Sequence, residues 1–144
     1  MTTLKDLREL SKERLEEASI LLQKHKYEGA KYLCGYAIEH ALKLQICKTL
    51  KWKSYPPKNP TSESFGENLK SFRTHNPETL LLLSGRHKEV YNKKGMLAVW
   101  DVLKVWNSEI RYEINPQTKI QMRGEVTTMI EAAKKMLRFL DIKL

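Results

Sequence analysis

The most extensive apolar pattern in the chain covers residues 27–50 and predicts one long helix. Two sets of apolar residues recur there at spacings of three and four positions, the repeat of an α-helix. The first set is Ala30, Leu33, Ala37, Ala41 and Leu44, and the second is Cys34, Ile38, Leu42 and Ile46. Because a surface helix needs only one apolar face, we expect neighbours on both faces of this one. Small residues along it, including Gly29 and Gly35, allow those neighbours to approach closely.

A helix is also predicted on each side of this one. Leucines and an alanine mark one face of residues 3–24, and the short turn His25-Lys26 predicts an antiparallel hairpin with the central helix. The last helix is expected to open at Asn115-Pro116, since Asn is a good N-cap and Pro fits the first turn. Its apolar face is predicted to carry Met122, Val126, Met129, Ala133, Met136 and Leu140.

Shorter helical patterns occupy residues 76–106. Asn76-Pro77 predicts a helix start, and Gly85 a helix end. Residues 86–94 indicate a short helical piece or a turn. Residues 95–106 indicate a helix with its tryptophans facing inward. No alternation typical of strands occurs, so the fold class is predicted to be all-α: a bundle of four to five helices with an up-down antiparallel core, in a single domain over residues 1–144.

Residues 52–75 interrupt the helical pattern. Pro56, Pro57 and Pro60 exclude a continuous helix, so a long basic loop is expected after the second helix. Its aromatic residues are Trp52, Tyr55, Phe65 and Phe72. Aromatic and basic residues together are typical of a nucleic-acid contact. The interpretation we favour is that these aromatics pack back on the core.

Charge is the compositional feature with most bearing on function. The net charge is +9, and residues 48–73 carry six basic and two acidic side chains. An anionic partner such as nucleic acid or nucleotide would be attracted, although general solubility explains the charge equally well. With no apolar run long enough for a membrane span and no signal-peptide core, a cytoplasmic protein without membrane contact is expected. Cys34 and Cys47 are expected to be buried free thiols.

Familiar catalytic and cofactor motifs are absent from the sequence. The glycines have no phosphate-binding spacing, and the histidines and cysteines have no ligand spacing, so neither a cofactor nor a metal is expected. Glu39 and Lys43, four positions apart on the central helix, predict a structural ion pair. Arg111 with Tyr112, before the last helix, forms a candidate site for a phosphate or an RNA base, or pins the loop to helix ends.

The order of these features resembles the HEPN family (higher eukaryotes and prokaryotes nucleotide-binding domain). Ala37, Glu39 and Lys43 match an A-x-E-x-x-x-K core in the family's long second helix. Thr74 and His75, followed by leucines, are similar to the start of a later helix, and Arg111-Tyr112 matches a pair before the last one. The resemblance covers nearly the whole chain in the right order. It implies a helical bundle that forms a homodimer, often encoded beside a minimal nucleotidyltransferase in toxin–antitoxin or phage-defence systems.

Many members of that family are metal-independent ribonucleases with an R-x4–6-H motif near the last helix. Five to seven residues after Arg111 stand Pro116, Gln117 and Thr118, so the histidine of the motif is missing. We therefore expect a non-catalytic protein that binds nucleotide or RNA, or seats a nucleotidyltransferase partner. The predicted binding residues are Arg111, Tyr112, Asn107, Lys53 and Lys58.

Two alternatives stay open. The first is a metal-independent endoribonuclease toxin with a displaced catalytic histidine, for which His75 is the candidate. Its imidazole would supply the proton transfer that the missing histidine cannot. The second is a structural protein whose positive surface docks an acidic partner protein.

Overall fold

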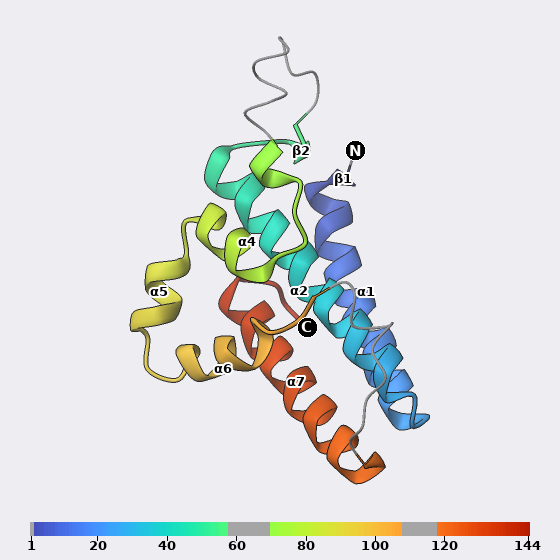
Figure 1. Cartoon of the computed structure of the whole chain (residues 1–144). Helices are drawn as coiled ribbons and strands as arrows, with labels where there is room; N and C mark the ends of the chain where they lie inside the picture. The colour runs from blue at the N-terminus through green and yellow to red at the C-terminus, as the bar shows by residue number, and fades with distance from the viewer. Residues whose placement is uncertain (1, 58–69, 108–117) are drawn as a thin grey trace.

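The computed structural model describes residues 2–57, 70–107 and 118–144. Within these residues the chain is mostly helical, which confirms the all-α prediction (Figure 1). The six α-helices are α1 (Leu4–Gln23), α2 (Tyr27–Leu50), α4 (Pro77–Ser84), α5 (His87–Asn92), α6 (Met96–Leu103) and α7 (Lys119–Phe139). The helix count exceeds the predicted four to five because residues 86–94 contain a separate short helix, α5, and not a turn.

Helix α2 is the centre of the fold. It packs against α1, α4 and α7, and Figure 1 shows α1 beside it as an antiparallel hairpin, with α4, α5 and α6 gathered on the other side. Both predicted apolar sets are buried, with Leu33 only partly so. At Gly35 a Cβ atom would lie 2.0 Å from the Trp106 ring, which is 2% exposed. A glycine is therefore required where this tryptophan crosses the helix.

A two-stranded antiparallel sheet ties the N-terminus to the segment after α2. Strand β1 (Thr2–Thr3) pairs with β2 (Ser54–Tyr55), in the register Thr2 to Tyr55 and Thr3 to Ser54. The sequence did not predict these strands, because two residues are too few for a visible alternation. Their pairing joins β2, which follows α2, to the residues directly before α1.

The aromatic residues after α2 pack inward where they are described. Trp52 lies 4.9 Å from the Phe72 ring and 6.0 Å from the Tyr55 ring, and Tyr55 is only 7% exposed. Phe72 belongs to a short 3-10 helix, η1 (Lys70–Phe72). The favoured interpretation is confirmed for these three residues, while Phe65 lies outside the described residues. The aromatic rings anchor the two ends of the basic loop to the core.

The start of the last helix was predicted wrongly. Helix α7 begins at Lys119, and its N-cap is Thr118, whose side chain accepts a hydrogen bond from the backbone N–H of Gln121. The Gln121 side chain in turn accepts from the backbone N–H of Thr118. This reciprocal capping box satisfies backbone N–H groups at the helix start, and it places that start after the predicted Asn115-Pro116.

Both cysteines are buried and free. Burial raises the pKa of the Cys34 thiol to about 12 and that of Cys47 to about 11, so both stay protonated at neutral pH. None of the helices in the described segments combines the length and apolarity needed to cross a membrane.

Candidate functional site

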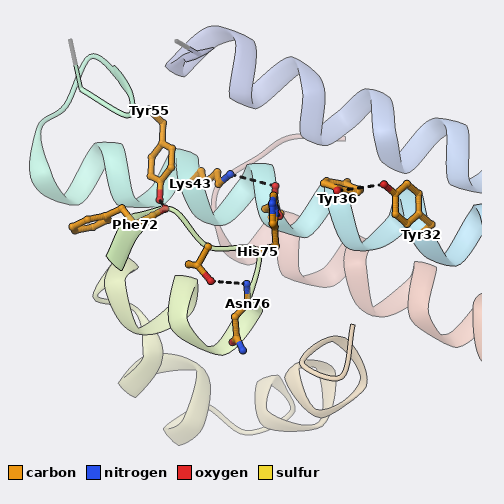
Figure 2. A network of polar contacts seen from close by, with 9 residues as sticks. Tyr32, Tyr36, Lys43, Tyr55, Phe72, His75 and Asn76 are labelled. Carbon is orange, nitrogen blue, oxygen red and sulfur yellow. Dashed lines mark hydrogen bonds and ion pairs between the residues drawn. The ribbon is translucent and has the colours of Figure 1, made fainter. Parts of the chain in front are cut away.

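Helix α2 carries a polar face in addition to its buried apolar ones. Glu39, His40 and Lys43 lie three, four and seven residues after Tyr36, which places all four on one side of the helix. The segment between η1 and α4 crosses this side and brings His75 against it (Figure 2). Residues from two separate parts of the chain therefore meet here.

Glu39 is the buried centre of this polar face. It is 4% exposed, and such a buried carboxylate needs charged or hydrogen-bonding partners. Lys43 Nζ lies 3.3 Å from Glu39 Oε2, as the spacing of four residues predicts. The second carboxylate oxygen, Oε1, lies 2.6 Å from His75 Nδ1. The carboxylate is thus shared between a lysine on its own helix and a histidine from another segment.

The position of His75 follows from the start of α4. Asn76 is the N-cap, since its side chain accepts from the backbone N–H of Thr79 at 3.1 Å. The backbone N–H of Asn76 donates to the Thr74 hydroxyl at 3.0 Å (Figure 2). These two local bonds fix the backbone on both sides of His75. Its side chain reaches Glu39 and still remains 57% exposed.

His40 is held differently from His75. Its Nδ1 is buried, and no hydrogen-bond partner for this atom lies within the described residues. Burial lowers the pKa of His40; Glu39 opposes this effect, and Lys43 and Arg14 add to it. The imidazole is therefore neutral at neutral pH. The centroid of the Tyr36 ring lies 6.2 Å from those of His40 and His75, so this ring is close to both histidines.

A pocket of about 320 Å³ opens over this face. Its lining includes two cationic residues, Lys43 and Arg73, and the exposed imidazole of His75. The rest of its lining is Thr2, Leu7, His40, Tyr55, Pro56, Phe72 and Thr74. Tyr55 forms one wall, fixed by its hydroxyl donating to the Phe72 carbonyl, and Lys43 Nζ lies 5.2 Å from the centre of its ring. Burial is also the main cause that raises the pKa of Tyr55, so this phenol is neutral.

The residues predicted from sequence fall only partly on this pocket. His75 and Lys43 line it, and Lys43 forms the predicted ion pair with the buried Glu39. Lys53 is exposed and directly precedes β2, whose Tyr55 lines the pocket. Asn107 is exposed and follows Trp106, whose ring is 5.0 Å from that of Tyr36. Arg111, Tyr112 and Lys58 lie outside the described residues.

Two residues of the site, Tyr36 and His40, were not predicted as site residues, and two more, Tyr55 and Arg73, were predicted only as part of the basic, aromatic loop. The first two carried a signal, because with Glu39 and Lys43 they form a polar stripe at helical spacing. The placement of Arg73 and Tyr55 beside α2 could not be predicted, since only the folding of the segments on either side of residues 58–69 brings them there. Position in space, and not spacing along the chain, defines this part of the site.

The chemistry available in the pocket is anion binding and proton transfer. Arg73 and Lys43 attract phosphate, while an imidazole oriented by a carboxylate is the usual form of a general base. Among the described residues, no group of three or more histidine, cysteine, aspartate or glutamate side chains could hold a metal ion. Comparisons of the chain with family models, curated proteins and solved structures give no match. The resemblance to the HEPN family therefore stays a prediction.

Proposed function

We propose that this chain is a HEPN-like protein that binds nucleotide or RNA, with phosphate groups entering the pocket beside α2. The observation that carries the proposal is the joint placement of Arg73, Lys43 and His75 around one opening of about 320 Å³. A phosphate fits such a pocket, and the excess charge of residues 48–73 draws a polyanion toward it. Phe72, which lines the pocket and is only partly buried, offers an aromatic surface on which a base can stack.

In this proposal the protein acts without catalysis of its own, as a cytoplasmic homodimer or as the partner of a minimal nucleotidyltransferase. The support is the resemblance stated above together with the absence of the R-x4–6-H histidine after Arg111. Lys53 and Asn107, both exposed, are proposed to bind the ligand as well, and Arg111, Tyr112 and Lys58 stay predicted binding residues outside the described part of the chain.

Filter binding of a short single-stranded RNA across a series of salt concentrations tests the binding function. We expect the logarithm of the affinity to fall linearly with the logarithm of salt. The substitutions Arg73→Ala and Arg111→Ala should each weaken binding and reduce that slope by about one. Lys134→Ala is the matched control, because Lys134 pairs with Glu131 on the far helix α7. An undetectable response of the wild-type protein to RNA and to nucleotides would refute the proposal.

A second candidate, a metal-independent endoribonuclease, is favoured by one specific observation. The 2.6 Å contact between Glu39 and His75 Nδ1 orients the imidazole as a base is oriented in a catalytic triad. In the reaction, His75 Nε2 would take the proton of a ribose 2′-hydroxyl as its oxygen bonds to phosphorus. The 5′ oxygen would then leave and take a proton from water, giving a 2′,3′-cyclic phosphate.

Incubation of the purified protein with RNA and EDTA separates the two candidates. Cleavage that survives EDTA and disappears in His75→Ala would establish the ribonuclease. Glu39→Gln should then lower the rate about 100-fold or more, since it removes the carboxylate that orients the base. Intact RNA after incubation with a protein that demonstrably binds it would leave the non-catalytic function.

A further inference from the structure

The outward-facing nitrogen of His75 is a hydrogen-bond acceptor held in a defined place. Glu39 is buried and ionised carboxylates only accept hydrogen bonds, so the proton of the 2.6 Å contact belongs to His75 Nδ1. A neutral imidazole carries a single proton, and its lone pair is then on Nε2. The carboxylate thus sets which nitrogen of the ring is free to accept.

The ring is also fixed in orientation although much of it is exposed. The edge-to-face contact with Tyr36 has a centroid distance of 6.2 Å and an interplanar angle of 74°. Together with the bond to Glu39, this contact restrains both the tilt and the rotation of a side chain that is 57% exposed. The acceptor is therefore preorganised before any ligand arrives.

Arg73 and Lys43 line the same pocket as His75 and are both donors. If these cations hold a 3′-phosphate of RNA, the 2′-hydroxyl of the same ribose lies close by, on the carbon next to the one that bears the phosphate. That hydroxyl is a hydrogen-bond donor, and it is the group that distinguishes RNA from DNA. Within this pocket, His75 Nε2 can accept the hydrogen bond that a 2′-hydroxyl donates, beside the cations proposed to hold the phosphate.

We infer that His75 selects RNA over DNA in this pocket, its Nε2 accepting a hydrogen bond from the ribose 2′-hydroxyl next to a phosphate bound by Arg73 and Lys43. The inference rests on the proposed nucleotide and RNA binding and names the chemical class of the ligand. It does not depend on cleavage. One neutral hydrogen bond at a partly exposed position predicts a preference for RNA of roughly fivefold.

The test compares the affinities of single-stranded RNA and DNA of one sequence in the same buffer and salt. RNA integrity is checked on a gel after each measurement. The informative substitution is His75→Asn. Its amide nitrogen takes the approximate place of Nδ1 and can still donate to Glu39, but nothing replaces Nε2. We expect RNA affinity to fall roughly fivefold to the level of DNA, with DNA affinity unchanged.

A second variant keeps the test valid if His75→Asn perturbs the fold. His75→Gln places an amide near the position of Nε2, so it should retain part of the preference for RNA. His25→Asn is the matched control: His25 Nδ1 contacts the Tyr27 hydroxyl in the α1–α2 turn, away from the pocket, and the preference should not change.

Three outcomes decide the matter. A preference for RNA that is lost in His75→Asn and unaffected by His25→Asn supports the inference. Equal affinities of the wild-type protein for RNA and DNA, or a preference that survives in His75→Asn, overturn it while leaving the binding function intact. Binding of neither polymer overturns both the inference and the proposed function.

Discussion

Trp106 occupies a place on α2 that only a glycine leaves open. The hypothetical Cβ of residue 35 would lie 2.0 Å from Cε2 and Nε1 of the indole, and Trp106 also contacts the Tyr36 ring at 5.0 Å. A methyl group at this position must displace a buried aromatic ring. The same ring packs against the polar face of α2, so its placement affects the site as well as the core.

The substitution Gly35→Ala should therefore destabilise the protein, by about 1–3 kcal/mol, because overpacking outweighs the gain in helix propensity. Thermal or urea unfolding followed by circular dichroism measures the change. Gly124→Ala on α7 is the matched control: a Cβ there meets nothing within 4 Å, so stability should rise by up to about 1 kcal/mol. Equal effects of the two substitutions would contradict the close approach of Trp106 to α2.

His40 makes stability depend on pH. Its folded-state pKa is lowered, chiefly by burial, so between that value and the ordinary pKa of about 6.5 the unfolded chain binds more protons than the folded one. The stabilising contribution of the neutral ring is therefore complete above about pH 6.5. It is lost progressively as the pH falls toward the folded-state pKa.

We expect the free energy of unfolding to decline below about pH 6.5 and this decline to be shallower in His40→Gln, which does not titrate. Urea unfolding at a series of pH values provides the measurement. His25→Gln, in the α1–α2 turn, serves as control. Its free energy of unfolding should change with pH as steeply as that of the wild type. A wild-type slope in His40→Gln would assign the acid sensitivity to other groups.

At the scale of elements, local chemistry fixes where helices begin. Two α-helices open with a complete capping box, α1 at Thr3 with Asp6 and α7 at Thr118 with Gln121. Asn76 caps α4 with its side chain alone. These bonds satisfy backbone N–H groups that have no partner within the helix.

Removal of the cap of α7 by Thr118→Ala should cost about 1 kcal/mol of stability. Thr127→Ala, in the middle of the same helix, is the control. The Thr127 hydroxyl donates to the Arg123 carbonyl and caps nothing, so its loss should be neutral or slightly stabilising. Chemical denaturation of the two variants beside the wild type measures both effects. A larger loss in Thr127→Ala would show that the cap is not what holds this end of the helix.

The sequence was sufficient for elements whose signals are local and long. The bounds of α2 and α4 follow from apolar periodicity, from the prolines after α2 and from the Asn76 and Gly85 caps. The start of α7 was predicted at Asn115-Pro116 from that pair alone, although Thr118 and Gln121 also have the spacing of a capping box. Strands β1 and β2 depend on contacts between residues far apart in the chain, which periodicity does not reveal.

The candidate site also contains residues that could be predicted from sequence spacing and residues that only the fold brings together. Glu39 and Lys43 were predicted as a pair because one helix fixes their distance. The contact of His75 with Glu39 joins residues from different parts of the chain, and no spacing encodes it. Arg73, Tyr55 and His40 entered the site only with the structure. At present the pocket, and not a sequence motif, is the stronger guide to function.

At the scale of the whole molecule, the proposed ligand contact is a ribonucleotide phosphate over the polar face of α2, beside Lys43, Arg73 and His75. The excess of positive charge acts over the whole surface and raises the rate of encounter, while the pocket decides where the ligand stays. The four histidines can report on binding at this pocket, since His40 and His75 line it and His25 and His87 do not.

The most direct test is the NMR spectrum of the histidine rings during titration with a short single-stranded RNA. Substitution of each histidine in turn assigns its ring signals. We expect the signals of His40 and His75 to shift together with one dissociation constant, while those of His25 and His87 stay in place. His87 is an apt internal control, because its Nδ1 is also buried without a partner in the described part of the chain. Shifts at His25 or His87 with His40 and His75 unchanged would contradict binding at this pocket.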